Sequence, residues 1–201
     1  MNCFFERTND LHGKKKIDRR VRKTKRQLQT GFIELLQEKS IHKITVRELS
    51  DLVDINRGTF YLHYKDVFDM LDQIENKLAE DFLDILSHYP SLLEESNVYP
   101  LLVEVFSFIK LNEGMMRVVF CENRSPVFLD HLKSSVKQRY FGDWKRIHFV
   151  KAPFEVDYFF SYFISGCIGL ITLWLETEMK ETPQQLAKLT ERMILNGNHA
   201  I

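Results

Sequence analysis

The residues with the clearest potential for chemistry form the stretch NRGTFYLHYK at positions 56–65. Its arginine, threonine, tyrosine, histidine and lysine side chains can all donate hydrogen bonds, and no carboxylate occurs between Asp54 and Asp66. In a chain with 28% charged residues, this stretch combines two tyrosines, a glycine and three cationic or titratable side chains with no acid. A surface rich in donors and free of acids suits contact with an anionic partner, which a carboxylate would repel.

The remaining sequence has no arrangement typical of a catalytic or metal site. It lacks HExxH, CxxC, a Gly-rich phosphate loop and a nucleophile elbow. Its seven histidines are scattered, and none lies at ligand spacing with a carboxylate or a cysteine. We therefore expect a protein that is not an enzyme and that holds no cofactor and no metal ion.

Two short helices are expected to present this stretch. In TVRE, Thr45 can cap a helix while Glu48 reaches back to it, which forms a capping box. VDIN then ends that helix, and Asn56 is a good N-cap for the next one. In the second helix Phe60 and Tyr64 are four residues apart, so both can point inward. The residues left for the outer surface are Arg57, Gly58, Thr59, Tyr61 and His63.

Two short helices joined in this way are typical of a helix-turn-helix that binds DNA. A duplex carries about one negative charge per 1.7 Å of its axis, which accounts for the missing carboxylates. Gly58 removes a side chain where the helix must approach the sugar-phosphate wall. Asn56 leaves the helix N-terminus, with its N–H groups and partial positive charge, available for a phosphate.

The individual side chains suit different parts of the duplex. Arg57 can reach a guanine edge in the major groove, and Thr59 or Tyr61 can meet a thymine methyl group or a phosphate. His63 and Lys65 would hold the phosphate backbone. With the start of the preceding helix included, the predicted DNA-binding residues are Thr45, Val46, Arg47, Asn56, Arg57, Gly58, Thr59, Tyr61, His63 and Lys65.

Charge is distributed unevenly along the chain. Residues 1–65 carry 15 Lys/Arg against 8 Asp/Glu, a net charge of +7, and residues 66–201 carry 13 against 20, a net charge of −7. Nine of the basic residues lie within positions 14–26. We interpret residues 1–18 as a mobile N-terminal arm and expect the basic run to contact phosphates, with chance clustering of solvated charges as the alternative.

The segment ITVRELSDLVDINRGTFYLHYKDVFDML resembles the DNA-binding motif of the tetracycline-repressor (TetR/AcrR) family. The resemblance covers roughly residues 20–72. Thr45 opens the second helix, Ile55 fills the turn, and RGTFYLHY matches the Gly-Thr-aromatic-Tyr-x-His-aromatic recognition helix of the family. Two positions depart from the family pattern. Asp54 replaces a small residue that is often glycine, and Lys65 comes earlier than the lysine that precedes the fourth helix in the family.

The resemblance implies two domains with different tasks. Residues 19–65 would form a three-helix DNA-binding domain, and residues 66–201 would bind an effector and dimerise. It also implies a homodimer on double-stranded DNA with a near-palindromic operator, and repression that a small apolar or aromatic effector relieves. Activation together with a protein or small-molecule co-activator is the alternative.

Apolar residues keep helical spacing in one segment after another along the second domain, and no alternating strand pattern occurs. The chain is therefore predicted to be all-α, with about nine helices. The last helix is expected to begin at TPQQ, residues 182–185. There a threonine cap, a proline and a glutamine stand in capping-box order.

The run YFFSYFISGCIGLITLWL at positions 158–175 has no charge over 18 residues. This is the lower limit for a membrane span, so a membrane-associated protein anchored by the run is the rival hypothesis. No Lys/Arg cluster or confined aromatic belt flanks it, which favours a helix buried at a subunit interface and no membrane partner. The resemblance implies that the last two helices pair with a second copy, and the predicted interface residues are Ser165, Gly166, Gly169, Leu173, Trp174, Leu186, Leu189 and Met193.

The second domain holds 19 of the 25 aromatic residues of the chain. Such a supply can line a cavity for a planar or lipophilic small molecule, although ordinary core packing is the alternative for each residue. The candidate pocket residues are Phe106, Met116, Phe120, Tyr140, Trp144, Phe159 and Phe163.

The cysteines and the N-terminus bear on the compartment. Cys3, Cys121 and Cys167 are odd in number and widely spaced, which is typical of a reducing environment. MNCFFERTND has neither the apolar region nor the cleavage site of a signal peptide. We therefore expect a cytoplasmic protein.

Overall fold

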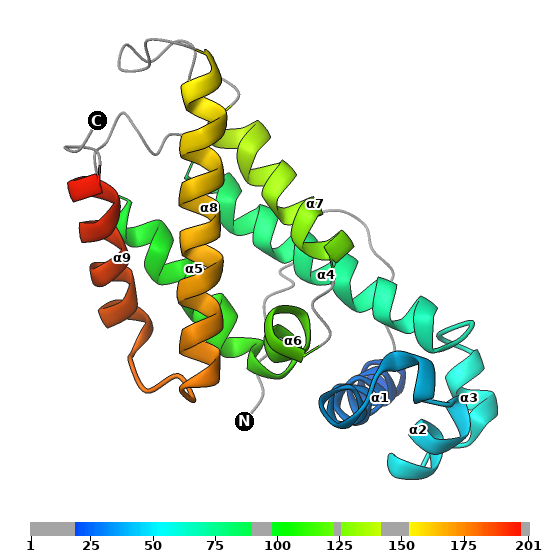
Figure 1. Ribbon diagram of the computed structural model, residues 1–201. Coiled ribbons are helices and arrows are strands. Elements are labelled where there is room, and N and C mark those ends of the chain that lie inside the picture. Colours follow the sequence, from blue (N-terminus) through cyan, green and yellow to red (C-terminus); the bar gives the residue numbers. More distant parts are fainter. Residues whose placement is uncertain (1–18, 90–97, 123–125, 142–152, 198–201) are drawn as a thin grey trace. The chain divides into compact units, whose positions relative to one another are not determined.

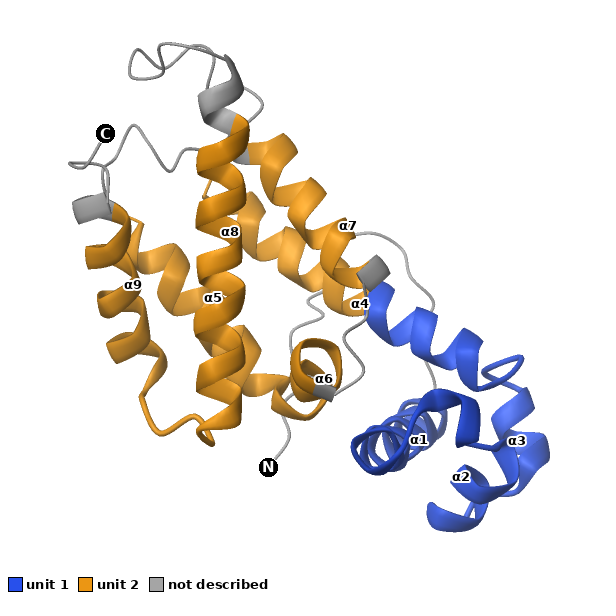
Figure 2. Ribbon diagram, in the orientation of Figure 1, with its two compact units in different colours: residues 1–76 blue, residues 77–201 orange. Residues whose placement is uncertain are grey.

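The computed structural model describes residues 19–89, 98–122, 126–141 and 153–197. These residues form nine α-helices with a few short helical turns between them, and they contain no strand (Figure 1). The predicted all-α class with about nine helices is confirmed. The chain divides into two compact units, residues 1–76 (unit 1) and 77–201 (unit 2), and the division falls inside α4, Val67–Ser87 (Figure 2). The functional boundary after residue 65 stays a prediction.

Unit 1 contains α1 (Arg19–Glu38), α2 (Val46–Leu52), α3 (Arg57–Tyr61) and the first turns of α4. Helix α2 comes close to α1 at Gly31, where a Cβ atom would overlap Cγ1 of Val53. The apolar residues of α1 recur at helical spacing and therefore share one face. The buried apolar side chains on that face are Leu28, Phe32, Leu35 and Leu36.

The start of α2 combines a local and a tertiary interaction. Oγ1 of Thr45 accepts a hydrogen bond from the Glu48 backbone N–H at 3.2 Å, as predicted for an N-cap. The Glu48 carboxylate pairs with the Lys39 ammonium just beyond α1. The predicted capping box is therefore found only in its first half, because a charged partner from another segment engages the carboxylate that was expected to reach back.

The turn between α2 and α3 requires an unusual backbone conformation. Asp54 has a φ of 53°, in the left-handed region that aspartate tolerates better than most residues. The Ile55 N–H then donates to the Ser50 carbonyl at 2.9 Å. Asp54 thus adopts the left-handed conformation that glycine often adopts at this position in the family.

Unit 2 contains the rest of α4 and five further helices, α5 (Tyr99–Leu111), α6 (Glu113–Arg117), α7 (Pro126–Val136), α8 (Pro153–Glu176) and α9 (Pro183–Gly197). Single π-helical turns, Val118–Glu122 and Lys137–Phe141, follow α6 and α7. Helix α5 packs along α9, and α8 contacts α6 and both π-helical turns (Figure 1). Proline at the first position of α7, α8 and α9 suits a helix start, where the missing N–H costs nothing.

The corner between α8 and α9 is fixed by its own side chains. The Thr182 N–H donates to Oε1 of Gln185 at 2.8 Å, and the Gln185 N–H donates to Oγ1 of Thr182 at 3.2 Å. This is the predicted capping box, complete in both directions. Glu178 and Met179 adopt left-handed backbone conformations, with φ of 58° and 49°, and so reverse the chain.

Trp174 belongs to the interior of unit 2. Its indole N–H donates to the Glu181 carbonyl at 3.1 Å, and its ring meets the Phe106 ring edge-on with centroids 5.7 Å apart. Leu186 on α9 is also buried. Neither Trp174 nor Leu186 can supply interface surface, contrary to the prediction, because both side chains face the core of their own unit.

Candidate nucleic-acid interface and apolar cavity

Helix α3 is anchored by the two residues predicted to point inward. Phe60 and Tyr64 are buried, and the centroids of their rings lie 5.5 Å apart. Burial raises the pKa of Tyr64 to about 12, so its phenol stays protonated. An isolated helix of five residues is unstable in water, so this aromatic packing is what holds α3 in place.

The N-terminus of α3 is capped by its own side chain. Oδ1 of Asn56 accepts a hydrogen bond from the Gly58 N–H at 2.7 Å, and the Asn56 carbonyl accepts one from the Thr59 N–H at 2.8 Å. Asn56 thus satisfies one of the N–H groups expected to contact a phosphate. The next residue, Arg57, has an exposed side chain at this end of α3.

The outer face of α3 carries the predicted contact residues. Tyr61 keeps 59% of its surface exposed, whereas the adjacent Phe60 keeps none. Leu62 is 80% exposed and was not predicted to be a contact residue. The sequence did indicate its exposure, because Leu62 lies two residues from both Phe60 and Tyr64 and so cannot share their buried side. We use the term recognition surface for the exposed and partly exposed residues Asn56, Arg57, Gly58, Thr59, Tyr61, Leu62, His63 and Lys65.

The carboxylates that border this surface are engaged by backbone N–H groups. Oδ1 of Asp66 accepts hydrogen bonds from the N–H groups of Phe68 and Asp69 at 2.9 and 2.8 Å, and so caps α4. Oδ2 of Asp69 accepts one from the Lys65 N–H at 2.9 Å, which lowers the pKa of that carboxyl. The acid-free stretch therefore ends at Asp66, the carboxylate that caps α4.

A cation from α1 lies beside the end of α3. Nζ of Lys25 sits 5.5 Å from the centroid of the Tyr64 ring. Burial, and secondarily the charge of Lys25, lowers the pKa of the partly exposed His63. The basic run at 14–26 indicated phosphate contacts in general, but only the structure shows that Lys25 lies next to the recognition surface.

The start of α2 supplies the other predicted contact residues. Thr45 and Arg47 are exposed and Val46 is partly exposed. Nε of Arg47 lies 3.7 Å from Oδ2 of Asp51 on the same helix. Such an exposed ion pair contributes little, so the guanidinium can exchange Asp51 for a phosphate.

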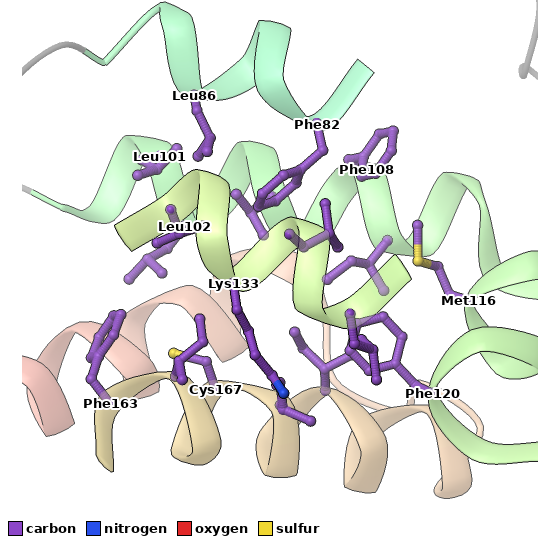
Figure 3. Close-up of a pocket in the computed structure, with 18 of the residues that line it drawn as sticks. Phe82, Leu86, Leu101, Leu102, Phe108, Met116, Phe120, Lys133, Phe163 and Cys167 are labelled. Atoms are coloured by element: carbon purple, nitrogen blue, oxygen red, sulfur yellow. The ribbon is translucent and has the colours of Figure 1, made fainter. Parts of the chain in front are cut away.

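Unit 2 contains a partly open cavity of about 190 Å³ lined almost entirely by apolar side chains (Figure 3). Four predicted pocket residues line it, namely Met116, Phe120, Phe159 and Phe163. Phe106 is not among its lining residues and packs against Trp174 instead. Trp144 and the side chain of Tyr140 lie outside the described part of the chain.

Helix α8 exposes a small-residue and apolar surface. Ser165, Gly166 and Gly169 are exposed, and a Cβ atom on either glycine would meet nothing within 4 Å. Leu173 is 58% exposed, Met193 on α9 is exposed, and Leu189 is partly exposed. Two exposed tyrosines on α8, Tyr158 and Tyr162, were not predicted. We call the surface formed by these residues of α8 and α9 the uncovered face.

Asp157–Glu176 is long and apolar enough to cross a membrane by length and composition, and 17% of its apolar window is buried inside the protomer. A core helix would bury most of such a segment. Most of this window of α8 is therefore exposed in the described part of the chain.

The family model for the C-terminal region of TetR transcriptional regulators matches residues 96–196, about half of the chain. The chain belongs to the TetR family. This membership classes it with DNA-binding transcriptional regulators rather than with enzymes.

Individual relatives of this TetR-family regulator agree with that assignment. YxbF of Bacillus subtilis strain 168, an uncharacterized HTH-type transcriptional regulator, is 24% identical over 171 residues, which cover 81% of this chain and 42% of YxbF. The chain thus spans less than half the length of that curated relative.

Solved structures share the fold of this TetR-family chain. A TetR transcriptional regulator from Streptococcus agalactiae 2603V has a TM-score of 0.59 and 24% identity, covering 88% of this chain and 96% of its own. A putative TetR-family regulator from Syntrophomonas wolfei has a TM-score of 0.66 and 16% identity, covering 89% of this chain and 96% of its own.

Proposed function

We propose that this TetR-family protein acts in the cytoplasm as a homodimeric repressor that binds a near-palindromic operator and leaves it when a small apolar effector binds. In this proposal residues 19–65 read DNA, and residues 66–201 bind the effector and dimerise. The observation that carries it is the recognition surface, which is donor-rich, acid-free and exposed on a helix whose other side is locked by Phe60 and Tyr64.

The recognition surface suits entry into a major groove. Arg57 begins α3 and can reach a guanine edge, while Tyr61 one turn later presents a ring and a hydroxyl to a thymine methyl group or a phosphate. Lys65 within this surface, together with Lys25 and Arg47 outside it, supplies cations for phosphate contacts that set position rather than sequence preference. Two such surfaces about 34–36 Å apart would enter successive major grooves.

The uncovered face suits a second copy of the chain. Gly166 and Gly169 leave room for a close helix approach, and Leu173 and Met193 offer apolar surface around them. A twofold interface places the same patch on both subunits, so one self-complementary surface is sufficient. Dimerisation would bury the apolar helix that the protomer leaves exposed.

The cavity in unit 2 suits an effector because it is concave, apolar and open to solvent on one side. An effector that favours one of two dimer states would change the separation of the two recognition surfaces. A coupling free energy of about 1–3 kcal/mol would change operator affinity roughly 5–150-fold.

In vitro selection from a random duplex library, followed by a Tyr61 series, tests the proposal. The wild-type protein should select a near-palindromic duplex, and Tyr61→Ala should weaken binding to it by about 1–3 kcal/mol while the protein stays folded. Tyr61→Phe, which keeps the ring and loses the hydroxyl, separates stacking from phosphate contact. Failure to select any duplex, or unchanged affinity in Tyr61→Ala, would contradict the proposed role.

A further inference from the structure

Among the residues that the structure describes, one charged group lies at the wall of the cavity in unit 2. Of the 22 described residues that line it, Lys133 on α7 is the one that carries a charge. The rest are aliphatic or aromatic, apart from the Met116 thioether and the Cys167 thiol. Burial raises the pKa of Cys167 to about 12, so this thiol stays neutral at physiological pH.

The Lys133 side chain spans the boundary between cavity and solvent. Its stem lies along the apolar wall, and its ammonium points toward α8, the helix that carries Phe163 and Cys167 (Figure 3). The side chain is 38% exposed, so the ammonium keeps contact with water. A long cationic side chain of this kind typically lays its methylenes on apolar surface and keeps its charged end hydrated.

The present partner of Lys133 is weakly held. Nζ of Lys133 lies 3.1 Å from Oδ1 of Asp130, three residues earlier on the same helix, and the Asp130 side chain is 72% exposed. Exposed pairs within one helix contribute little to stability. The ammonium can therefore exchange Asp130 for the anionic group of a ligand at little cost.

The neighbouring lysine has a different environment. Nζ of Lys137, one turn later, lies 2.8 Å from Oδ1 of Asp157 on α8 and 5.7 Å from the centroid of the Phe160 ring. Lys137 does not line the cavity. It therefore offers a matched control, a cation on the same stretch of chain whose partner belongs to a different helix.

We infer that the effector is a single-headed amphiphile of the carboxylate class, whose hydrocarbon chain fills the cavity and whose carboxylate binds the Lys133 ammonium. This inference rests on the proposed effector role of the cavity and names its ligand class. An apolar lining excludes charge from the interior, and the single cation at the wall selects an anion at one end. The cavity volume of about 190 Å³ lies below the usual range for ligand pockets, which favours a medium-length chain over a long one.

Isothermal titration of the full-length protein with decanoate, decanol and decylamine tests this inference. These probes share one chain length and differ in head-group charge. Wild-type protein should bind decanoate at least about tenfold more tightly than decanol, and decylamine least tightly, because a charge-assisted hydrogen bond at a partly exposed site has that effect. Equal affinity for decanoate and decanol, or no binding of either, would overturn the inference.

Three variants separate recognition from structure. Lys133→Met should abolish the preference for decanoate and keep decanol binding, whereas Lys137→Met should change neither. Asp130→Asn should tighten decanoate binding, because it releases the ammonium from its competitor. If the Lys133–Asp130 pair were merely structural, Lys133→Met and Asp130→Asn would change binding in the same direction, and that result would overturn the inference.

Operator binding, measured separately by fluorescence anisotropy, distinguishes the two proposals. If the wild-type protein and all variants bind the selected duplex equally well but none prefers decanoate, the ligand class is refuted and DNA recognition stands. Carboxylate-selective binding by a protein that selects no duplex would refute DNA recognition and leave the ligand class standing.

Discussion

In unit 1 the large side chains of Phe32, Phe60 and Tyr64 are buried, and polar residues carry the proposed function at the surface. In unit 2 many apolar side chains are not packed into a closed core. They surround a cavity, and they leave α8 with only 17% of its apolar window buried. The DNA-binding proposal therefore rests on the acid-free surface of a well-packed unit, and the effector and dimer proposals rest on apolar side chains that line a cavity or are exposed.

The largest effect that sharpens this comparison is expected on the uncovered face. Gly169→Leu adds a side chain where a Cβ atom meets nothing within 4 Å, so the protomer has room for it. A close dimer interface would contain the substitution twice and should lose about 2 kcal/mol or more of association free energy. Sedimentation equilibrium measures this loss, and circular dichroism should show unchanged helix content.

Gly166→Leu serves as a second probe of the same face, since its Cβ position is equally open. If both leucine variants sediment as the wild-type dimer does, the second copy does not cover this part of α8. If the wild-type chain sediments as a monomer, the proposed dimer is wrong.

In unit 1 an added methyl group should instead destabilise the fold of the single chain. Gly31→Ala places a Cβ on Cγ1 of Val53, and Cδ1 of Leu49 and Cδ2 of Leu52 lie only 3.4 Å away. We expect a loss of about 1–3 kcal/mol in the free energy of unfolding, despite the better helix propensity of alanine. Urea denaturation measures this change, and a double variant with Val53→Ala should recover part of it.

The recognition surface should also bind DNA in a pH-dependent way. Because the pKa of His63 is lowered, its imidazole is neutral in the unbound protein near pH 7 and protonates only below its ordinary pKa of 6.5. Phosphate contact favours the protonated form, so DNA binding should take up a proton and affinity should rise as the pH falls below 6.5. The size of the rise measures how far DNA binding shifts the pKa of His63, since each pKa unit corresponds to a tenfold change in affinity.

The same shift makes an opposite contribution to folding. The unfolded chain binds the proton more readily than folded His63, so this residue stabilises the fold above the unfolded pKa and loses that contribution as the pH falls through the folded value. Anisotropy titrations from pH 5.5 to 7.5 on wild type and His63→Gln measure the binding effect. Identical pH dependence in both would exclude His63 from the contact.

The smallest effect is expected from filling the cavity. Val105→Leu adds one methylene at a residue that lines it, and should stabilise the effector-free protein by up to about 0.8 kcal/mol. The thermal midpoint measures the gain. If Val105→Leu instead destabilised the protein as much as Gly31→Ala does, the cavity would have no room for a methylene in solution, and unit 2 would be as tightly packed as unit 1.

Local interactions were predictable from sequence, and tertiary ones were not. The caps at Thr45, Asn56 and Thr182 each join residues two or three positions apart, so the sequence contains both partners. The pairing of Glu48 with Lys39 depends on where α1 ends, which local spacing does not reveal.

The limits for unit 2 have the same cause. The length and apolarity of α8 predicted a helix that needs a partner, but not the side on which Trp174 turns inward. The aromatic content predicted a pocket, and four candidates line it, while Phe106 joined the core. Lys133 could not be chosen from sequence, because only the packing of α7 on its neighbours brings a lysine to an apolar wall.

The most direct test of the central claim inserts a carboxylate into the recognition surface. Thr59→Glu should weaken binding to the selected duplex by about thirtyfold or more, roughly 2 kcal/mol, since the new charge would face phosphates. Ser134→Glu, at an exposed position in unit 2, should bind like wild type, and both variants should keep the wild-type thermal midpoint. A Thr59→Glu protein that is folded and binds the duplex with wild-type affinity would contradict the account.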